Sequence, residues 1–260
     1  MTSRTSLPAL AVILLLTIRY AVASPIACET FDYDSDSRLA GHSGGYGWSA
    51  AWVSAGAKIS DESISYASEG LSKGGGSSLK VEVNGENVLS RSIGTESDRS
   101  GADYFVSFIF QIKNASETGE ISGEVFTGWQ CQDTNPSLKI DNIGFTGLHG
   151  RAGARVNGLS KLVKTPLQYG TTYFLVIKYG GWNGREYTTT TVWLNPASGD
   201  EDVADPFIKV KTSADTGADG FFGLQVRALG LTADKYYLFD DICVGMTWAD
   251  VTTAPIKSQP

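Results

Sequence analysis

The sequence is poor in the residues that build transition-metal sites. It contains two histidines, His42 and His149, and three cysteines that stand far apart. Zinc centres built from His and Cys need several such ligands at short spacings, so the sequence does not support a centre of that kind. Two methionines against 30 glycines and eight prolines also indicate many turns and little helix.

No cluster of basic residues is present either. Lysine and arginine total 21 against 28 aspartates and glutamates, and the formal net charge is −7. Nucleic acids and anionic membrane surfaces attract clustered positive charge. Neither is therefore expected as a partner.

Catalytic motifs are scarce. Glycosidases use two carboxylates at a defined separation, but no strand carries an E-x-D-x-x-E pattern. Acids that stand close together, Asp61-Glu62 with Glu69 and Glu120 with Glu124, lie in polar, glycine-rich or loop-like surroundings and are expected to be solvated charges. A Ser-His-Asp arrangement stays open as an alternative.

The amino terminus resembles a signal peptide. Met1–Ser6 carries Arg4 and no acid, Leu7–Ile18 is apolar, and Ala21-Val-Ala23 offers small residues for cleavage after Ala23. The apolar run is too short to span a bilayer. An uncleaved anchor, or a lipoprotein modified at Cys28, remains as an alternative. We therefore expect an exported protein, secreted or periplasmic, with 19 basic residues left against 28 acidic ones.

Strand patterns fill the rest of the chain. Asp103–Ile112 is almost uniformly apolar, as in a strand buried on both faces. Other segments alternate, or are rich in β-branched and aromatic residues: Ser78–Val83, Val88–Ile93, Ser137–Ile143, Thr172–Tyr179, Tyr187–Leu194, Phe207–Lys211, Phe221–Arg227 and Tyr236–Val244. The pattern predicts one all-β domain over residues 24–251, a monomeric two-sheet antiparallel β-sandwich, followed by a flexible tail over 252–260.

Several motifs carry a resemblance to secreted bacterial proteins of the concanavalin A-like, or laminin-G-like, jelly roll class. They are Phe31-Asp32, Leu39-Ala-Gly41, Gly44-Gly-Tyr-Gly-Trp48, Tyr173–Tyr179, Val192–Pro196 and Asp240–Asp250. The resemblance implies the fold but no activity. Lyases of that class carry Gln-x-His where this chain has Gln111-Ile-Lys113. Related proteins often finish with a Pro-Glu-Pro sorting segment, which this sequence does not show before Pro260, so a freely exported protein is expected.

The two ends of the mature chain match each other. Cys28 precedes Phe31, and Cys243 lies between Ile242 and Val244. If these apolar residues point into the core, alternation places both sulfurs on the opposite face of adjacent strands, close enough to form a disulfide. Free thiols, or pairing through Cys131, are the alternatives.

Acids at the same ends suggest a structural calcium ion. Glu29, Asp32, Asp240 and Asp241 could supply the oxygen ligands that Ca²⁺ prefers where the first and last strands meet. Sandwiches of the class that this chain resembles often hold such an ion there. The alternative is that these acids bind loop amides and basic side chains.

One tryptophan stands apart from the others. Trp182 lies with Asn183 and Arg185 in the glycine-rich tip between two expected strands, so the tip is a candidate sugar-binding patch. The alternative is a ring folded back over its neighbours. A loop rim around Asn135, Asp141, Asn142 and His149 has less support.

Taken together, the sequence favours an exported, non-catalytic protein that binds an extracellular polysaccharide or belongs to the cell envelope. A polysaccharide-cleaving enzyme, hydrolase or lyase, and a structural or adhesive module that binds another protein remain as alternatives.

Overall fold

The computed structural model of the protein describes residues 24–54, 56–68, 71–82, 87–93, 101–116, 118–121, 126–131, 143–148, 150–157, 159–196, 201, 204, 208–213, 218, 220, 223–229 and 234–252. The expected signal peptide lies outside these residues. Within these ranges, no helix is long and apolar enough to cross a bilayer.

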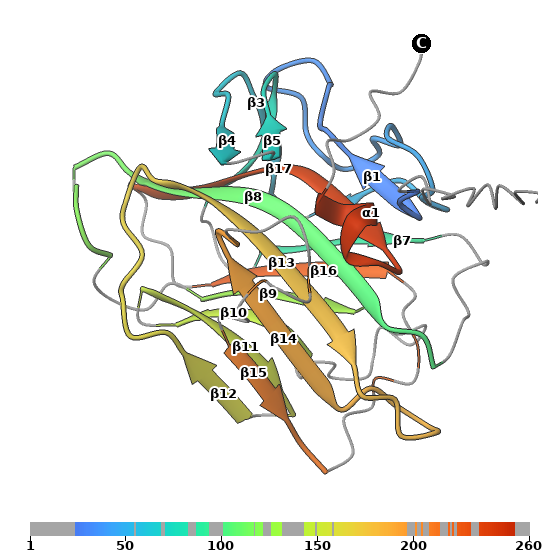
Figure 1. Ribbon diagram of the computed structural model, residues 1–260. Coiled ribbons are helices and arrows are strands. Elements are labelled where there is room, and N and C mark those ends of the chain that lie inside the picture. The colour runs from blue at the N-terminus through green and yellow to red at the C-terminus, as the bar shows by residue number, and fades with distance from the viewer. Residues whose placement is uncertain are drawn as a thin grey trace, which may run out of the picture.

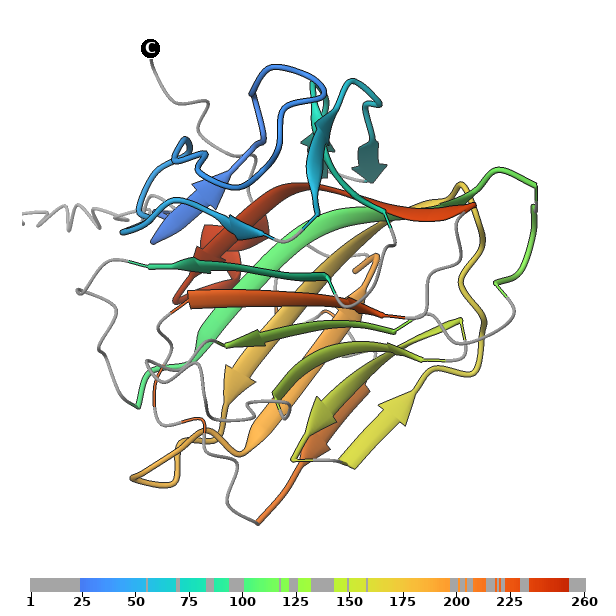
Figure 2. The same ribbon diagram turned by 180° about the vertical axis from the view of Figure 1, so that it is seen from behind.

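Two antiparallel sheets form the protein, as expected from the strand patterns (Figures 1 and 2). The larger has the order β15 (Ile208–Lys211), β14 (Thr189–Leu194), β13 (Thr172–Gly180), β8 (Tyr104–Asn114), β17 (Lys235–Gly245), β6 (Ser78–Glu82) and β3 (Lys58–Ser60), with β1 (Ala27–Glu29) also paired to β17. The smaller has the order β12 (Leu159–Leu162), β11 (Arg151–Val156), β10 (Ile143–Leu148), β9 (Phe126–Cys131), β16 (Gly223–Leu229), β7 (Asn87–Ser92) and β2 (Val53–Ser54).

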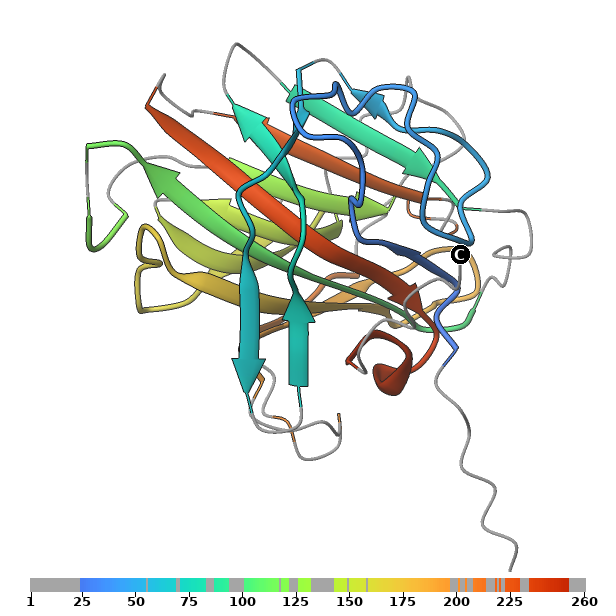
Figure 3. The same ribbon diagram turned by 90° about the horizontal axis from the view of Figure 1, so that it is seen from above.

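Two further elements stand outside the sandwich. A hairpin of β4 (Ser65–Ser68) and β5 (Leu71–Gly74) and the short helix α1 (Trp248–Thr252) pack against the outer face of the larger sheet (Figure 3). Thr252, where the tail was expected to begin, is buried and its hydroxyl donates to the Trp248 carbonyl over 3.0 Å. The folded part of the chain therefore includes α1.

The hydrophobic core has two layers. The main layer lies between the sheets and contains the inward residues of β8, such as Phe108 and Phe110. A second layer covers the outer face of the larger sheet, where Ile109 of β8 packs with Phe174 and Trp248. Because both faces are covered, every residue from Tyr104 to Ile112 is buried, as the apolar run in the sequence predicts.

The two ends of the mature chain meet in the larger sheet. β1 pairs with β17, so that Cys28 lies directly opposite Cys243, and the two form a disulfide with a Cα–Cα distance of 4.2 Å. Both sulfurs lie in the second layer, whereas Phe31, Ile242 and Val244 lie between the sheets. The alternation expected from the sequence is therefore present. Of the third cysteine, Cys131, only its place in β9 is described.

The glycines of Gly44-Gly-Tyr-Gly-Trp48 allow this segment to lie tightly on β1. Gly45 and Gly47 have φ angles of 69° and 78°, and a Cβ on Gly47 would lie 1.9 Å from the Ile26 carbonyl oxygen. Trp48 then donates from its indole to the Cys28 carbonyl over 3.0 Å. This motif thus has a structural role in holding the first strand.

Candidate functional site

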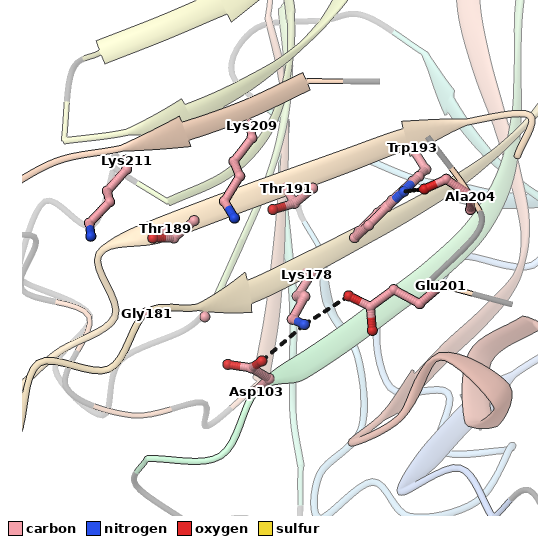
Figure 4. Close-up of a pocket in the computed structure, with 11 residues that line it drawn as sticks. Asp103, Lys178, Gly181, Thr189, Thr191, Trp193, Glu201, Ala204, Lys209 and Lys211 are labelled. Atoms are coloured by element: carbon pink, nitrogen blue, oxygen red, sulfur yellow. Dashed lines mark hydrogen bonds and ion pairs between the residues drawn. The ribbon is translucent and has the colours of Figure 1, made fainter. Parts of the chain in front are cut away.

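A pocket of about 560 Å³ lies on the outer face of the larger sheet, over β13, β14 and β15 (Figure 4). Its wall and floor are formed by Asp103, Lys178, Gly180, Gly181, Thr189, Thr191, Trp193, Glu201, Ala204, Lys209 and Lys211. A polar pocket with both charge signs and hydroxyl groups has the chemistry needed to bind a hydroxyl-rich ligand.

Sheet register arranges these side chains in rows. Thr191 pairs with Lys178 on one side and with Lys209 on the other. Thr189 pairs with Gly180 and Lys211 in the same way. Residues two apart on a strand point to the same face, so two rows, each with a central threonine, form the pocket floor.

One lysine neutralises the acids of the pocket. The Lys178 ammonium lies 3.0 Å from Asp103 and 2.8 Å from Glu201, and it also lies over the Phe105 ring at 5.0 Å. Burial lowers the pKa of Lys178, but the hydrogen bonds and charges of the two carboxylates outweigh this effect and raise it overall. Lys178 therefore carries its charge and orients both acids.

The tryptophan of the pocket supports its rim. Trp193 is buried, and its indole nitrogen donates to the Ala204 carbonyl over 3.3 Å. Ala204 and Glu201 belong to the segment that follows β14, so this contact holds part of that segment over the sheet. Trp193 therefore forms a fixed part of the pocket wall.

The side chains of the hairpin tip do not form the exposed aromatic surface on which a sugar ring could stack. Trp182 is half-buried, packs edge-on against Tyr187 with ring centroids 5.1 Å apart, and joins the core layer between the sheets. The Asn183 side-chain oxygen accepts from the backbone N–H groups of Arg185 and Glu186, each at 2.9 Å. Asn183 and Arg185 are exposed. The indole thus lies on the opposite side of the sheet from the pocket, and its role in stacking stays a prediction.

The four acids of the predicted metal site have different surroundings. Glu29 is buried in a pair with Arg91, and it also accepts from Tyr33 and Trp52 at 2.8 and 3.1 Å. This matches the alternative in which an acid binds basic and polar groups. Glu29 therefore has little capacity left for a metal ion.

The other three acids surround a bulge in β17. Pairing with β8 shifts register between Asp240 and Cys243, and Asp241 has a φ of 50°. Burial, followed by the charge of Asp241, raises the pKa of Asp240 to about 9, and Asp32 and Glu29 add to the effect. Asp241 accepts from the Gly74 N–H. Burial also raises the pKa of Asp241, whereas Gly74 and Lys73 lower it.

Asp32, Asp240 and Asp241 lie near one another, but they are not arranged as a metal centre. In the part of the chain that the structure describes, no three His, Cys, Asp or Glu side chains form a group that could hold a metal ion. Asp32 is exposed, whereas Asp240 and Asp241 are buried. Their oxygens are of the type that calcium prefers, so three of the four predicted ligands remain chemically suitable.

A second polar cluster lies near the end of β8. Glu62, expected to be solvated, instead accepts from Lys113 and from the Tyr236 hydroxyl, at 2.5 and 3.0 Å. Burial and Glu62 raise the pKa of Tyr236 to about 12. A catalytic tyrosine base works best with a pKa near the working pH, so this cluster resembles a structural charge network.

The comparisons with known proteins give no family. No protein-family model matches the chain, and no curated protein matches it in sequence.

Three solved structures are similar to the chain at TM-scores below 0.5. An endo-β-1,4-glucuronan lyase from the fungus Trichoderma reesei is 14% identical, with 84% of this chain and 96% of that chain covered and a TM-score of 0.47. The carbohydrate recognition domain of Emp46p is 8% identical, covering 75% and 87%, with a TM-score of 0.43. The botulinum neurotoxin type G receptor binding domain is 9% identical at a TM-score of 0.49, and the match covers 88% of this chain and 50% of that one. Such likeness assigns neither ligand nor reaction.

Sequence patterns alone did not reveal the pocket. The alternation of Ile208–Lys211 could have placed Lys209 and Lys211 on one face of a strand, because the residues that alternate with them, Ile208 and Val210, are apolar and buried. Their proximity to Lys178 depends on the order β13-β14-β15 and on its register, which no local pattern encodes.

Proposed function

We propose that the protein binds a glycan without cleaving it, and that the pocket over β13, β14 and β15 is the binding site. The observation that supports this most strongly is the pocket lining, in which hydroxyl, ammonium and carboxylate groups line one cavity. Sugar hydroxyls both donate and accept hydrogen bonds, so a site with both kinds of partner suits them.

The threonines are the proposed contacts at the pocket floor. Neither Thr189 nor Thr191 directs its hydroxyl into a side-chain hydrogen bond with another described residue. A hydroxyl that lines a cavity without such a bond is available to a ligand. The backbone of Gly180 and Gly181 and the ion-paired acids then border the same space.

The pairing of the pocket acids suits the binding of a ligand. Asp103 and Glu201 both form ion pairs with the Lys178 ammonium. One ammonium group therefore holds both carboxylates at the border of the pocket, where their oxygens can accept hydrogen bonds from ligand hydroxyls.

Filling the pocket tests this proposal. Thr191→Phe places a ring on the pocket floor and is expected to weaken glycan binding more than about tenfold. Affinity electrophoresis in gels containing plant, algal or bacterial polysaccharides measures this, and a reducing-sugar assay should detect no cleavage. The matched control is Thr165→Phe, at an exposed threonine outside the pocket.

The outcomes separate the alternatives. Retardation that Thr191→Phe abolishes and Thr165→Phe preserves supports the pocket. A Trp182→Ala protein provides a second arm: if it alone loses retardation, the hairpin tip is the site. No retardation in any gel would favour a structural or adhesive module, and release of reducing ends or unsaturated uronates would favour an enzyme.

The proposal includes a structural calcium ion near the bulge of β17. Asp32, Asp240 and Asp241 would be its carboxylate ligands, without Glu29, because Arg91 already occupies that side chain. These three carboxylates do not form a metal-binding group as they stand, so the proposal requires their side chains to move together when the ion binds. The ion would neutralise Asp240 and Asp241, whose pKa values are raised by burial and by neighbouring acids. It would stabilise the junction of the first and last strands.

Calcium is expected to stabilise the folded protein. A ligand that binds only the folded state adds about 2.7 kcal/mol at 100 times its Kd, so the melting temperature should rise with added Ca²⁺ and fall in EDTA. Asp32→Asn should remove the response, whereas Asp34→Asn, at a nearby exposed acid, should preserve it. Identical melting curves in calcium and in EDTA would overturn the metal proposal.

A further inference from the structure

We infer that the pocket selects glycans that carry negative charge, through Lys209 and Lys211 of the edge strand β15. The inference rests on the proposed function, since it names the class of ligand for the same pocket. An anionic sugar carries a carboxylate or a sulfate group, and both groups accept charge-assisted hydrogen bonds from lysine.

The charges of the pocket do not cancel. Asp103 and Glu201 both pair with Lys178. Lys209 and Lys211 are exposed and, within the described ranges, have no ion-pair partner. Both acids therefore pair with the same lysine, Lys178. The ammonium groups of Lys209 and Lys211 are left to bind a ligand.

The two cations have a defined spacing. Lys209 and Lys211 lie two residues apart on β15 and extend from the same face as Lys178 (Figure 4). A strand rises about 3.3 Å per residue, so their backbones are about 6.6 Å apart. Each lysine also faces one threonine of β14, Thr191 or Thr189. Each row thus offers an ammonium beside a hydroxyl, a combination that can bind one anionic group together with a neighbouring sugar hydroxyl.

The overall charge of the protein makes this site stand out. The formal net charge is −7, so a polyanion is repelled by most of the surface. Nonspecific attraction of the kind that basic proteins show is therefore not available. Any retention of an anionic polysaccharide must come from a local cationic site.

Matched ligands and variants test the selectivity. The probes are polygalacturonate and its methyl-esterified form, which differ in the carboxylate charge, and dextran sulfate and dextran, which differ in the sulfate. The protein variants are Lys209→Gln with Lys211→Gln, and the control is Arg38→Gln with Lys164→Gln, which makes the same change in net charge at exposed positions outside the pocket. Dissociation constants come from affinity electrophoresis, corrected with gels that lack polysaccharide.

Wild type should bind at least one charged probe at least about tenfold more tightly than its uncharged partner. The Lys209 and Lys211 double variant should lose about ten- to thirtyfold in that affinity, since each exposed charged contact contributes a severalfold factor. The control pair should lose less than about twofold. Raising the salt concentration should weaken wild-type binding more than that of the pocket variant, because salt screens exposed charges.

The possible failures differ. Equal binding of charged and uncharged probes, with no effect of the two lysines, would overturn the charge selectivity and leave glycan binding intact. Equal losses in the pocket and control variants would show that net charge alone is responsible, and would also overturn it. Failure to retain any probe, charged or neutral, would remove the proposed function itself.

Discussion

Replacing Arg91 with methionine is expected to lower the free energy of unfolding by about 3–5 kcal/mol, because it leaves the Glu29 carboxylate buried without a counter-ion. Both side chains are about 1% exposed. Arg91 also donates to the Ala50 and Gly44 carbonyls at 2.9 and 2.8 Å. Loss of this side chain therefore leaves several hydrogen-bond acceptors without a donor. Urea denaturation measures the resulting decrease in the free energy of unfolding.

A double variant separates charge from packing. Glu29→Gln combined with Arg91→Met removes both charges and should recover part of the loss, since no bare carboxylate remains. Glu82→Gln, at a partly exposed acid that pairs with Lys58 and Lys80, is the surface control and should cost less than about 1 kcal/mol. A loss below about 1 kcal/mol for Arg91→Met would show that the buried pair does not stabilise the fold.

Removing the disulfide is the second change with a large expected effect. Cys28 and Cys243 are separated by 215 residues, and closing so long a loop restricts the unfolded chain. Cys28→Ala with Cys243→Ala should lower the free energy of unfolding by about 2–5 kcal/mol. Urea denaturation of wild type and of the double variant measures this difference, and wild type is also measured in reductant.

Two controls isolate the bond. Reductant should destabilise wild type, with a delay because both sulfurs are buried, and it should leave the double alanine variant unchanged. Mass spectrometry of an unreduced digest should recover the two peptides joined. Free thiols at both positions, or equal stability of both proteins, would contradict the assignment.

The fold was predictable where the pattern was strong and local. Asp103–Ile112 is apolar throughout, and it forms β8, buried on both faces. The segment from Thr172 and the segment from Tyr187 became β13 and β14, paired across the expected glycine-rich turn. Segment 137–143 lies outside the described residues except at Ile143, where β10 begins.

Short polar strands escaped prediction because they carry little periodic signal. β12 has the sequence Leu-Ser-Lys-Leu, and its residues are exposed or half-buried. β4 and β5 depend on tertiary contacts, such as that of Tyr66 with Phe174. The helix α1 is five residues long, too short for a helical period to show. Its start is fixed by Asp250, which accepts from the Met246 and Thr247 N–H groups.

The candidate site was less predictable than the fold. Trp182 was singled out because it stands in a turn, but a turn residue can fold back, and Tyr187 provides the surface on which it does so. Lys178 was part of an expected strand without being a candidate. Only the order of β13, β14 and β15 brings it to the same pocket as Lys209 and Lys211.

Lysine footprinting tests most directly whether this pocket binds a glycan. The folded protein is acetylated briefly with and without polygalacturonate, or another polysaccharide that retards it, and labelling is read by mass spectrometry. Lys209 and Lys211 should lose most of their labelling when the polysaccharide is present, whereas the exposed Lys164 outside the pocket should label equally in both samples. Unchanged labelling of Lys209 and Lys211 under conditions of full binding would contradict the pocket as the glycan site.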